Sequence, residues 1–168
     1  QVDLEMSFVT QDQVMAMVEH VLKEAFSAVG VDFETPLRRI PYWEAMDTYG
    51  SDKPDTRYGM HLMDVSDTFK ASRFQVFAGA ANTEGERVKC INAKGAGAWP
   101  RAQIDKLEKV AKTLGAKGLA WIAFREDGSV NSPIVKFFSD DEMDALKARA
   151  DVEPGDLVMF AACARKEA

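Results

Sequence analysis

The sequence has 168 residues, of which 46% are apolar and 29% are charged, and its formal net charge is −6. This composition is typical of a folded globular protein and excludes disorder along the whole length, and a chain of this size can bury one sizeable core or two smaller ones. Charges recur every few residues, so no stretch reaches the roughly 20 apolar residues of a membrane-spanning helix, and we expect no signal peptide.

The two cysteines, Cys90 and Cys163, are far apart in the sequence, and neither His20 nor His61 is close to them. This spacing favours neither a disulfide framework nor a zinc site built on nitrogen and sulfur ligands. We therefore expect no metal site, a reducing and cytoplasmic location, and structural roles for Cys90 and both histidines.

Residues 1–8 alternate between polar and apolar side chains, which predicts a strand with one buried face. The polar face carries Gln1, Asp3 and Glu5. Two carboxylates at i and i+2 on one strand face could hold a cation, either an ammonium group or magnesium with its waters. The alternative is a solvated outer face, and the residue types alone leave both interpretations open.

The next elements carry clear helix signals. Thr10 and Gln13 have the spacing of a capping box, and the apolar stripe from Val14 to Val29 predicts a long amphipathic helix that ends at Gly30. A shorter helix is expected over 41–49, with Gly50 at its exit, followed by a turn over 51–55.

Shorter elements follow, and we place the start of a second unit near Gly59. The patterns predict helices over 64–72, 100–114 and 139–150, and strands over 74–78, 87–93, 119–124 and 157–162. A turn over 126–129 leads into Val130 and the segment 134–138. Short strands between helices, without βαβ repetition, indicate the α+β class.

A basic segment lies between residues 87 and 117, with eight Lys or Arg residues against Asp105 and Glu108, a local charge of +6. Its members are Arg87, Lys89, Lys94, Arg101, Lys106, Lys109, Lys112 and Lys117. Such segregation can create a local field that attracts a polyanion, although a lysine-rich solvated helix face is the alternative. The loop 95–97 could present backbone N–H groups to a phosphate, but it lacks the spacing of a phosphate-binding fingerprint, which favours a plain loop.

Three segments together resemble one family. QVDLEMSF at 1–8 is similar to the end of the second class-defining motif of bacterial-type aspartyl-tRNA synthetases, which are class II enzymes. YWEAM at 42–46 and YGSDKPDTR at 49–57 resemble a segment specific to the same enzymes. GAKGLAWI at 115–122 and SPIVKF at 132–137 resemble their inserted (GAD) domain, which is shared with the B subunit of the tRNA-dependent amidotransferase.

The resemblance implies part of the antiparallel catalytic domain over 1–58 and a small α+β insertion domain with a mixed sheet over 59–168, whose end leads back to the catalytic core. It also implies that the phosphate-binding arginines of the second and third motifs lie outside residues 1–168. We therefore expect an excised and inactive piece of an ATP-dependent aspartate–tRNA ligase. The whole enzyme is expected to be a homodimer that uses aspartate, ATP, Mg²⁺ and tRNA. It is not expected to bind a membrane.

The same resemblance assigns the aspartate ammonium group to Asp3, with Gln1 and Glu5 facing the same cleft. It places the turn with Asp52, Lys53 and Asp55 near the active site, but it assigns these residues no chemical role. The tRNA is expected to contact Lys94, Arg101, Lys106, Lys109 and Lys112 of the insertion domain. The alternative function is an RNA-contacting accessory domain of the amidotransferase B subunit, without chemistry of its own.

Overall fold

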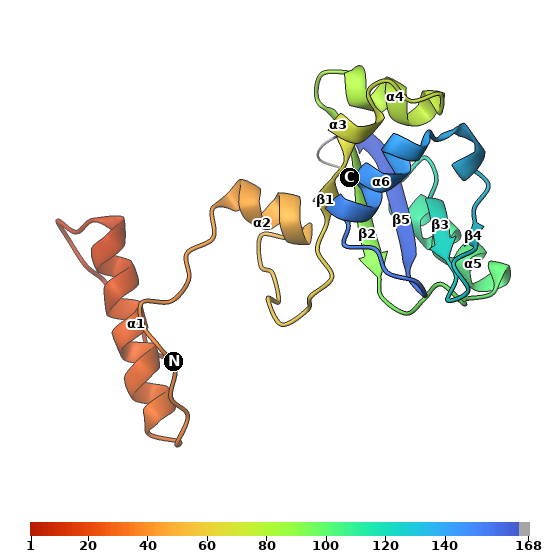
Figure 1. Cartoon of the computed structure of the whole chain (residues 1–168). Helices are drawn as coiled ribbons and strands as arrows, with labels where there is room; N and C mark the ends of the chain where they lie inside the picture. Colours follow the sequence, from red (N-terminus) through yellow and green to blue (C-terminus); the bar gives the residue numbers. More distant parts are fainter. Residues whose placement is uncertain (165–168) are drawn as a thin grey trace. The chain divides into compact units, whose positions relative to one another are not determined.

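The computed structural model describes residues 1–164, and the chain divides into two compact units, Gln1–Pro41 and Tyr42–Ala168 (Figure 1). The short helix α2 (Tyr42–Tyr49) thus belongs to the second unit. The division near Gly59 rests on the sequence patterns and the resemblance, and it stays a prediction.

The first unit is built around helix α1 (Gln11–Ser27), and its predicted capping box is confirmed. The Gln13 N–H donates to Thr10 Oγ1 at 3.4 Å, and the Thr10 N–H donates to Gln13 Oε1 at 2.8 Å. Gly30 takes the left-handed conformation expected after the end of a helix, with φ of 79°. The helix buries none of its side chains, so its apolar stripe stays largely exposed.

The strand predicted over residues 1–8 is wrong. The segment has no strand structure, and Val2 and Leu4 are 70% and 50% exposed. A strand requires a neighbour for its backbone hydrogen bonds, and residues 1–164 provide none to this segment. Leu4 and Met6 instead line a shallow pocket together with apolar side chains of α1. The alternation of polar and apolar residues therefore marks a side of this segment that faces α1, and not a strand of a sheet.

The second unit contains one five-stranded sheet in the order β1-β2-β5-β3-β4. The strands are β1 (Met63–Asp64), β2 (Glu86–Ala93), β3 (Ala120–Phe124), β4 (Val130–Asn131) and β5 (Leu157–Ala164). The α+β class is confirmed, but the pairings of the described strands are all antiparallel, where a mixed sheet was expected. The long β2 and β5 pair along their whole length, from Glu86 opposite Ala164 to Ala93 opposite Leu157.

The helices of this unit are α2, α3 (Ser66–Phe69), α4 (Gln75–Asn82), α5 (Arg101–Thr113) and α6 (Asp140–Arg149), with a 3-10 turn η1 (Val135–Phe137). The strand predicted over 74–78 is wrong because this segment forms α4. Phe77 and Ala80, three residues apart, are the buried side chains of that helix, which is the spacing of one helix face. The capping box at Ser139 and Glu142 is confirmed.

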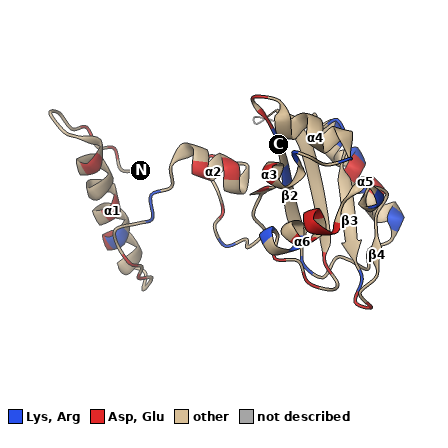
Figure 2. Cartoon of the chain, turned by 45° about the horizontal axis from the view of Figure 1, so that its top comes forward, with Lys and Arg blue, Asp and Glu red and all other residues tan. Residues whose placement is uncertain are grey.

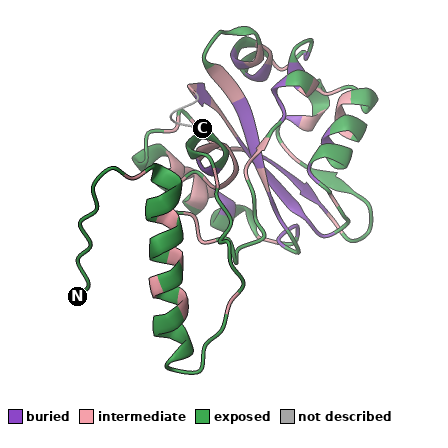
Figure 3. Cartoon of the chain, turned by 90° about the vertical axis from the view of Figure 1, so that its left-hand side faces the viewer, coloured by how far each residue is buried: buried purple, intermediate pink, exposed green. Residues whose placement is uncertain are grey.

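The sheet separates two apolar clusters, and Figure 3 shows the buried residues concentrated along its strands. Alternate residues point to opposite faces: Ile122 and Phe160 pack with α3, α4 and α6, whereas Trp121 and Met159 pack with α5. The expected inner face of α5 is confirmed at Ile104, which is 2% exposed, but Leu114 beyond its end is 83% exposed.

Candidate functional site

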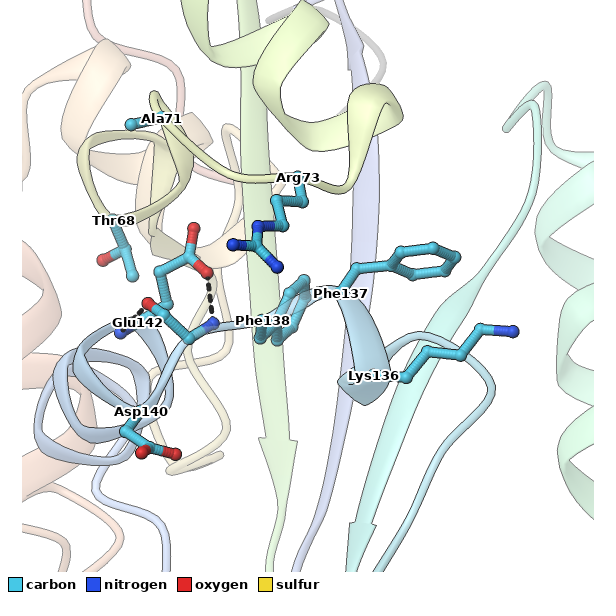
Figure 4. Close-up of a pocket in the computed structure, with 9 residues that line it drawn as sticks. Thr68, Ala71, Arg73, Lys136, Phe137, Phe138, Asp140 and Glu142 are labelled. Carbon is cyan, nitrogen blue, oxygen red and sulfur yellow. Dashed lines mark hydrogen bonds between the residues drawn. The ribbon is translucent and has the colours of Figure 1, made fainter.

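A pocket of about 480 Å³ opens on the second unit between the turn after α3, η1 and the start of α6 (Figure 4). Its lining comprises Thr68, Ala71, Arg73, Lys136, Phe137, Phe138, Ser139, Asp140 and Glu142. Figure 4 shows Arg73 pointing toward Glu142 and Phe138, with Lys136 and Phe137 on the other side. Asp140 points away from Arg73.

Local contacts hold the walls of this pocket. The Ser139 N–H donates to Glu142 Oε2 at 2.7 Å, so the Glu142 carboxylate is engaged in capping α6. Phe137 stacks on Phe74 with ring centroids 5.6 Å apart, and Lys136 Nζ lies 5.1 Å from the centroid of Phe137. Sequence reasoning missed this site, although the neighbouring pairs Arg73-Phe74 and Lys136-Phe137 were a signal that could have found it.

The predicted aspartate-binding residues lie in the first unit and are exposed. The Gln1 side-chain amide donates to both carboxylate oxygens of Asp3, at 2.9 and 3.1 Å. Glu5 forms no hydrogen bond or ion pair with the described residues. The structure therefore brings Gln1 and Asp3 together and leaves Glu5 separate, and their assignment to a substrate stays a prediction.

The charged turn after α2 is held by its own side chains. Arg57 forms a two-point ion pair with Asp55, with Nε 2.9 Å from Oδ1 and Nη2 2.5 Å from Oδ2. Hydrogen bonds from the Arg57 side chain and backbone lower the pKa of the Asp55 carboxyl. Ser51 Oγ accepts from the Lys53 N–H at 3.1 Å. The turn is thus a preformed structure, while Asp52 and Lys53 stay without an assigned chemical role.

The basic segment is less available to a polyanion than its composition suggests. Lys89 is only 3% exposed and bonds to Asp47 Oδ1 at 3.1 Å. On α5, Arg101 pairs with Asp105 at 2.7 Å and Lys112 pairs with Glu108 at 2.7 Å. Figure 2 shows Lys and Arg on the outer side of α5, and within the part of the chain that is described Lys106 and Lys109 have no ion-pair partner.

Lys94 lies among carboxylates rather than on an open basic surface. Its ammonium is 3.2 Å from Asp151 Oδ2, 3.2 Å from Glu153 Oε2 and 3.3 Å from Asp156 Oδ2, and it also donates to the Asp151 carbonyl. Although partial burial acts to lower the pKa of Lys94, these carboxylates raise it overall. The predicted tRNA contacts are therefore not equivalent, because Lys94 is already neutralised by its neighbours.

The remaining candidates have structural roles. Burial raises the pKa of the Cys90 thiol to about 12, which makes it a poor nucleophile. His61 packs edge-on against Tyr49, with ring centroids 5.1 Å apart. In the loop before α5, Gly97 donates to the Gly155 carbonyl at 2.6 Å, and a Cβ there would lie 2.3 Å from the Phe124 carbonyl oxygen. This loop requires glycine for close backbone packing rather than for a phosphate.

Comparison with known proteins identifies the second unit. The family described as the GAD domain matches residues 77–168, more than half of the chain. The aspartate–tRNA(Asp/Asn) ligase of Symbiobacterium thermophilum is 49% identical over 163 residues, which is 96% of this chain and 27% of the relative. The aspartate–tRNA ligase of Agathobacter rectalis has the same identity and coverage, and that of Ruminiclostridium cellulolyticum is 47% identical.

The chain thus spans about a quarter of the length of these curated relatives, 27%. Similarity along 96% of the chain confirms the resemblance to aspartyl-tRNA synthetases, including segments that precede the GAD match. The chain therefore belongs to the GAD domain family.

Proposed function

We propose that the protein that carries this chain is an aspartate–tRNA ligase. The observation that carries the proposal is the 49% identity to such ligases over 96% of the chain. The alternative, an accessory domain of an amidotransferase B subunit, does not account for the similarity of the residues that precede the GAD match.

The reaction implied has two steps. The carboxylate of aspartate attacks the α-phosphate of ATP, which forms aspartyl adenylate and releases pyrophosphate. A hydroxyl of the terminal adenosine of tRNA then takes the aspartyl group and releases AMP. In this reaction the Asp3 carboxylate binds the ammonium group of aspartate, and the Gln1 amide, which donates to both Asp3 oxygens, orients that carboxylate.

Mg²⁺ and ATP stay proposals for the whole enzyme. Among residues 1–164, no group of three or more His, Cys, Asp or Glu side chains is placed to hold a metal ion. In the whole enzyme magnesium would neutralise the phosphates of ATP, and no step assigned to this chain uses it.

The tRNA contact is proposed for the outer side of α5. Lys106 and Lys109 carry this proposal because, in contrast to Arg101 and Lys112, they have no carboxylate partner within residues 1–164. Phosphate contacts position RNA without reading its sequence. No helix in that part of the chain is long and apolar enough to cross a membrane, and the homodimer and the cytoplasmic location are proposed from the resemblance alone.

The test uses the full-length protein and measures aspartate charging of tRNA. Removal of one member of a desolvated charge pair typically costs 2 to 5 kcal/mol, so Asp3→Ala should raise the KM for aspartate by roughly a hundredfold. The KM for ATP should change much less because its phosphates bind elsewhere. A full-length protein that does not charge tRNA with aspartate would refute the function, and an unchanged KM for aspartate in the variant would remove Asp3 from the pocket.

We also propose that residues 1–168 alone are inactive. The electrostatic stabilisation of the transferring group is usually the largest catalytic contribution, and the phosphate-binding arginines implied by the resemblance are not among these residues. Aspartate-dependent exchange of pyrophosphate into ATP should be undetectable with the isolated chain. Exchange that scales with its concentration and survives repurification would contradict this.

A further inference from the structure

Lys89 is a buried lysine in the middle of the sheet, and the proposed function gives it no role. It lies on β2 between Val88 and Cys90, which belong to the apolar cluster on the face opposite to α5. Alternation along the strand therefore directs Lys89 to the same face as α5. There it lines a pocket of about 270 Å³ together with apolar side chains such as Leu107 and Met159. The Lys89 side chain is only 3% exposed.

The stability of the fold does not explain a lysine at this position. An ammonium group is strongly hydrated, and lysine is almost never fully buried unless it is paired. Replacement of a buried ion pair by apolar side chains of similar volume is often neutral or stabilising. Because the side chains around Lys89 are apolar, a methionine can occupy the same space, and the charge itself indicates a role other than stability.

The ammonium group of Lys89 contacts helix α2. Lys89 Nζ donates to Asp47 Oδ1 at 3.1 Å and to the Asp47 carbonyl at 3.4 Å. The GAD match begins at residue 77, so Lys89 lies inside it and Asp47 lies before it. The ion pair therefore links the sheet of the GAD domain to a segment outside that match, which the chain shares with aspartate–tRNA ligases.

Helix α2 in turn positions the charged turn that follows it, residues 51–57. The Leu62 N–H donates to the Thr48 carbonyl at 2.8 Å, so the chain after the turn returns to the end of α2. The turn carries Asp52 and Lys53, whose side chains have no ion-pair partner among residues 1–164. These two charged groups are thus available to other parts of the whole protein or to its substrates, and the placement of α2 determines where they lie.

We infer that Lys89 is a positioning residue: through Asp47 it holds α2, and with it the turn 51–57, against the sheet. The inference rests on the proposed function for the reaction that this placement serves. A small misplacement of groups that surround a reaction lowers its rate strongly. Loss of the ion pair should therefore slow the activation of aspartate. The binding of aspartate should change little, because Asp3, which is proposed to bind it, belongs to the other unit.

The experiment compares the full-length protein with Lys89→Met, which keeps an unbranched side chain and removes the charge. The kcat of aspartate-dependent exchange of pyrophosphate into ATP should fall about tenfold, whereas the KM for aspartate should change by less than about twofold. Hydrogen–deuterium exchange of residues 42–50, which contain α2, should become at least about fivefold faster. Deuterium exchange of β5 should stay at the wild-type rate, because the sheet does not need the charge.

Two further variants separate this role from general effects of lost charge. Lys147→Met makes the same change in a lysine that pairs with Asp144 at 3.2 Å but has a side chain that is 45% exposed. It should leave both kcat and the deuterium exchange of α2 at wild-type values. Asp47→Ala removes the partner of Lys89. The double variant Lys89→Met/Asp47→Ala should lose no more activity than Lys89→Met alone, because both residues act through one contact.

A wild-type kcat in Lys89→Met would overturn the inference, and so would an additive loss of activity in the double variant. Faster deuterium exchange in β5 as well as in α2 would show that Lys89 serves the stability of the whole sheet, which also overturns it. A wild-type protein without aspartate-dependent pyrophosphate exchange would refute the proposed function instead. Deuterium exchange of α2 tests the contact between Lys89 and Asp47 without any activity, so the two failures are distinguishable.

Discussion

Asp156 joins the end of β2, the loop that follows it and the loop that precedes β5, and its replacement by alanine should strongly destabilise the second unit. Its side chain is 3% exposed. The carboxylate accepts hydrogen bonds from the Gly95 N–H at 3.0 Å, the Glu153 N–H at 2.9 Å and the Asn92 amide at 2.9 Å. Asp156→Ala leaves the Gly95 and Glu153 N–H groups without this acceptor, whereas the Asn92 amide still donates to the Ala150 and Asp151 carbonyls.

The size of the effect follows from the two backbone hydrogen bonds that are lost outright, from the Gly95 and Glu153 N–H groups. A hydrogen bond to a charged group contributes about 1.5 to 3 kcal/mol, so the low end of this range gives a loss of about 3 kcal/mol in the free energy of unfolding. The matched control is Glu153→Gln, because Glu153 contacts the same Lys94 but its side chain is 70% exposed. An exposed ion pair contributes about 0 to 1 kcal/mol, and the control should therefore lose less than 1 kcal/mol.

Urea unfolding followed by tryptophan fluorescence measures the difference. All three tryptophans, Trp43, Trp99 and Trp121, belong to the second unit, so the signal reports on that unit. With a urea dependence of roughly 1.5 kcal/mol per molar, the midpoint of Asp156→Ala should fall by about 2 M. A shift no larger than that of Glu153→Gln would refute the role assigned to the buried carboxylate.

Further predictions concern the core, the pH dependence and one thiol. Phe69→Ala, which removes a fully buried ring, should cost about 3 to 5 kcal/mol in urea unfolding. Gly97→Ala should destabilise because its Cβ would lie 2.3 Å from a backbone oxygen, whereas Gly79→Ala in α4, with open space around it, should stabilise by up to about 1 kcal/mol. Burial acts to raise the pKa of Asp156, but its hydrogen bonds from the Glu153 N–H, Asn92 and the Gly95 N–H lower it overall. Its stabilisation should therefore be complete above the ordinary aspartate pKa of 3.8 and should disappear as the pH falls through the lower native value. Wild type and Asp156→Asn should consequently converge in stability in acid. Cys90, buried and with a pKa raised to about 12, should resist iodoacetamide until urea unfolds the chain.

Elements with local signals could be predicted from the sequence. The capping boxes at Thr10 and Ser139 correctly indicate the starts of α1 and α6, because both partners lie within four residues of each other. The segment 74–78 was harder, since a short apolar run fits a strand and a buried helix equally well. Packing of Phe77 against Phe69 and Phe160 belongs to the tertiary structure, and it forms only when distant segments meet.

The surroundings of the basic segment depend on contacts that the sequence spacing does not reveal. Lys94 and Asp156 are 62 residues apart, and only the pairing of β2 with β5 brings their loops together. Lys89 lies on β2 of the same sheet and is buried, although the charge count along the sequence assigns it to the basic segment. Charge counts along the chain therefore overestimated the available positive surface.

The central claim is that the protein carrying this chain is an aspartate–tRNA ligase, and amino-acid-dependent exchange of pyrophosphate into ATP tests it most directly. The full-length protein is assayed with each of the twenty amino acids in turn, with Asp3→Ala as the matched variant. We expect exchange with aspartate alone, and a large loss of that exchange in the variant at low aspartate. Exchange with a different amino acid, or none with aspartate, would contradict it.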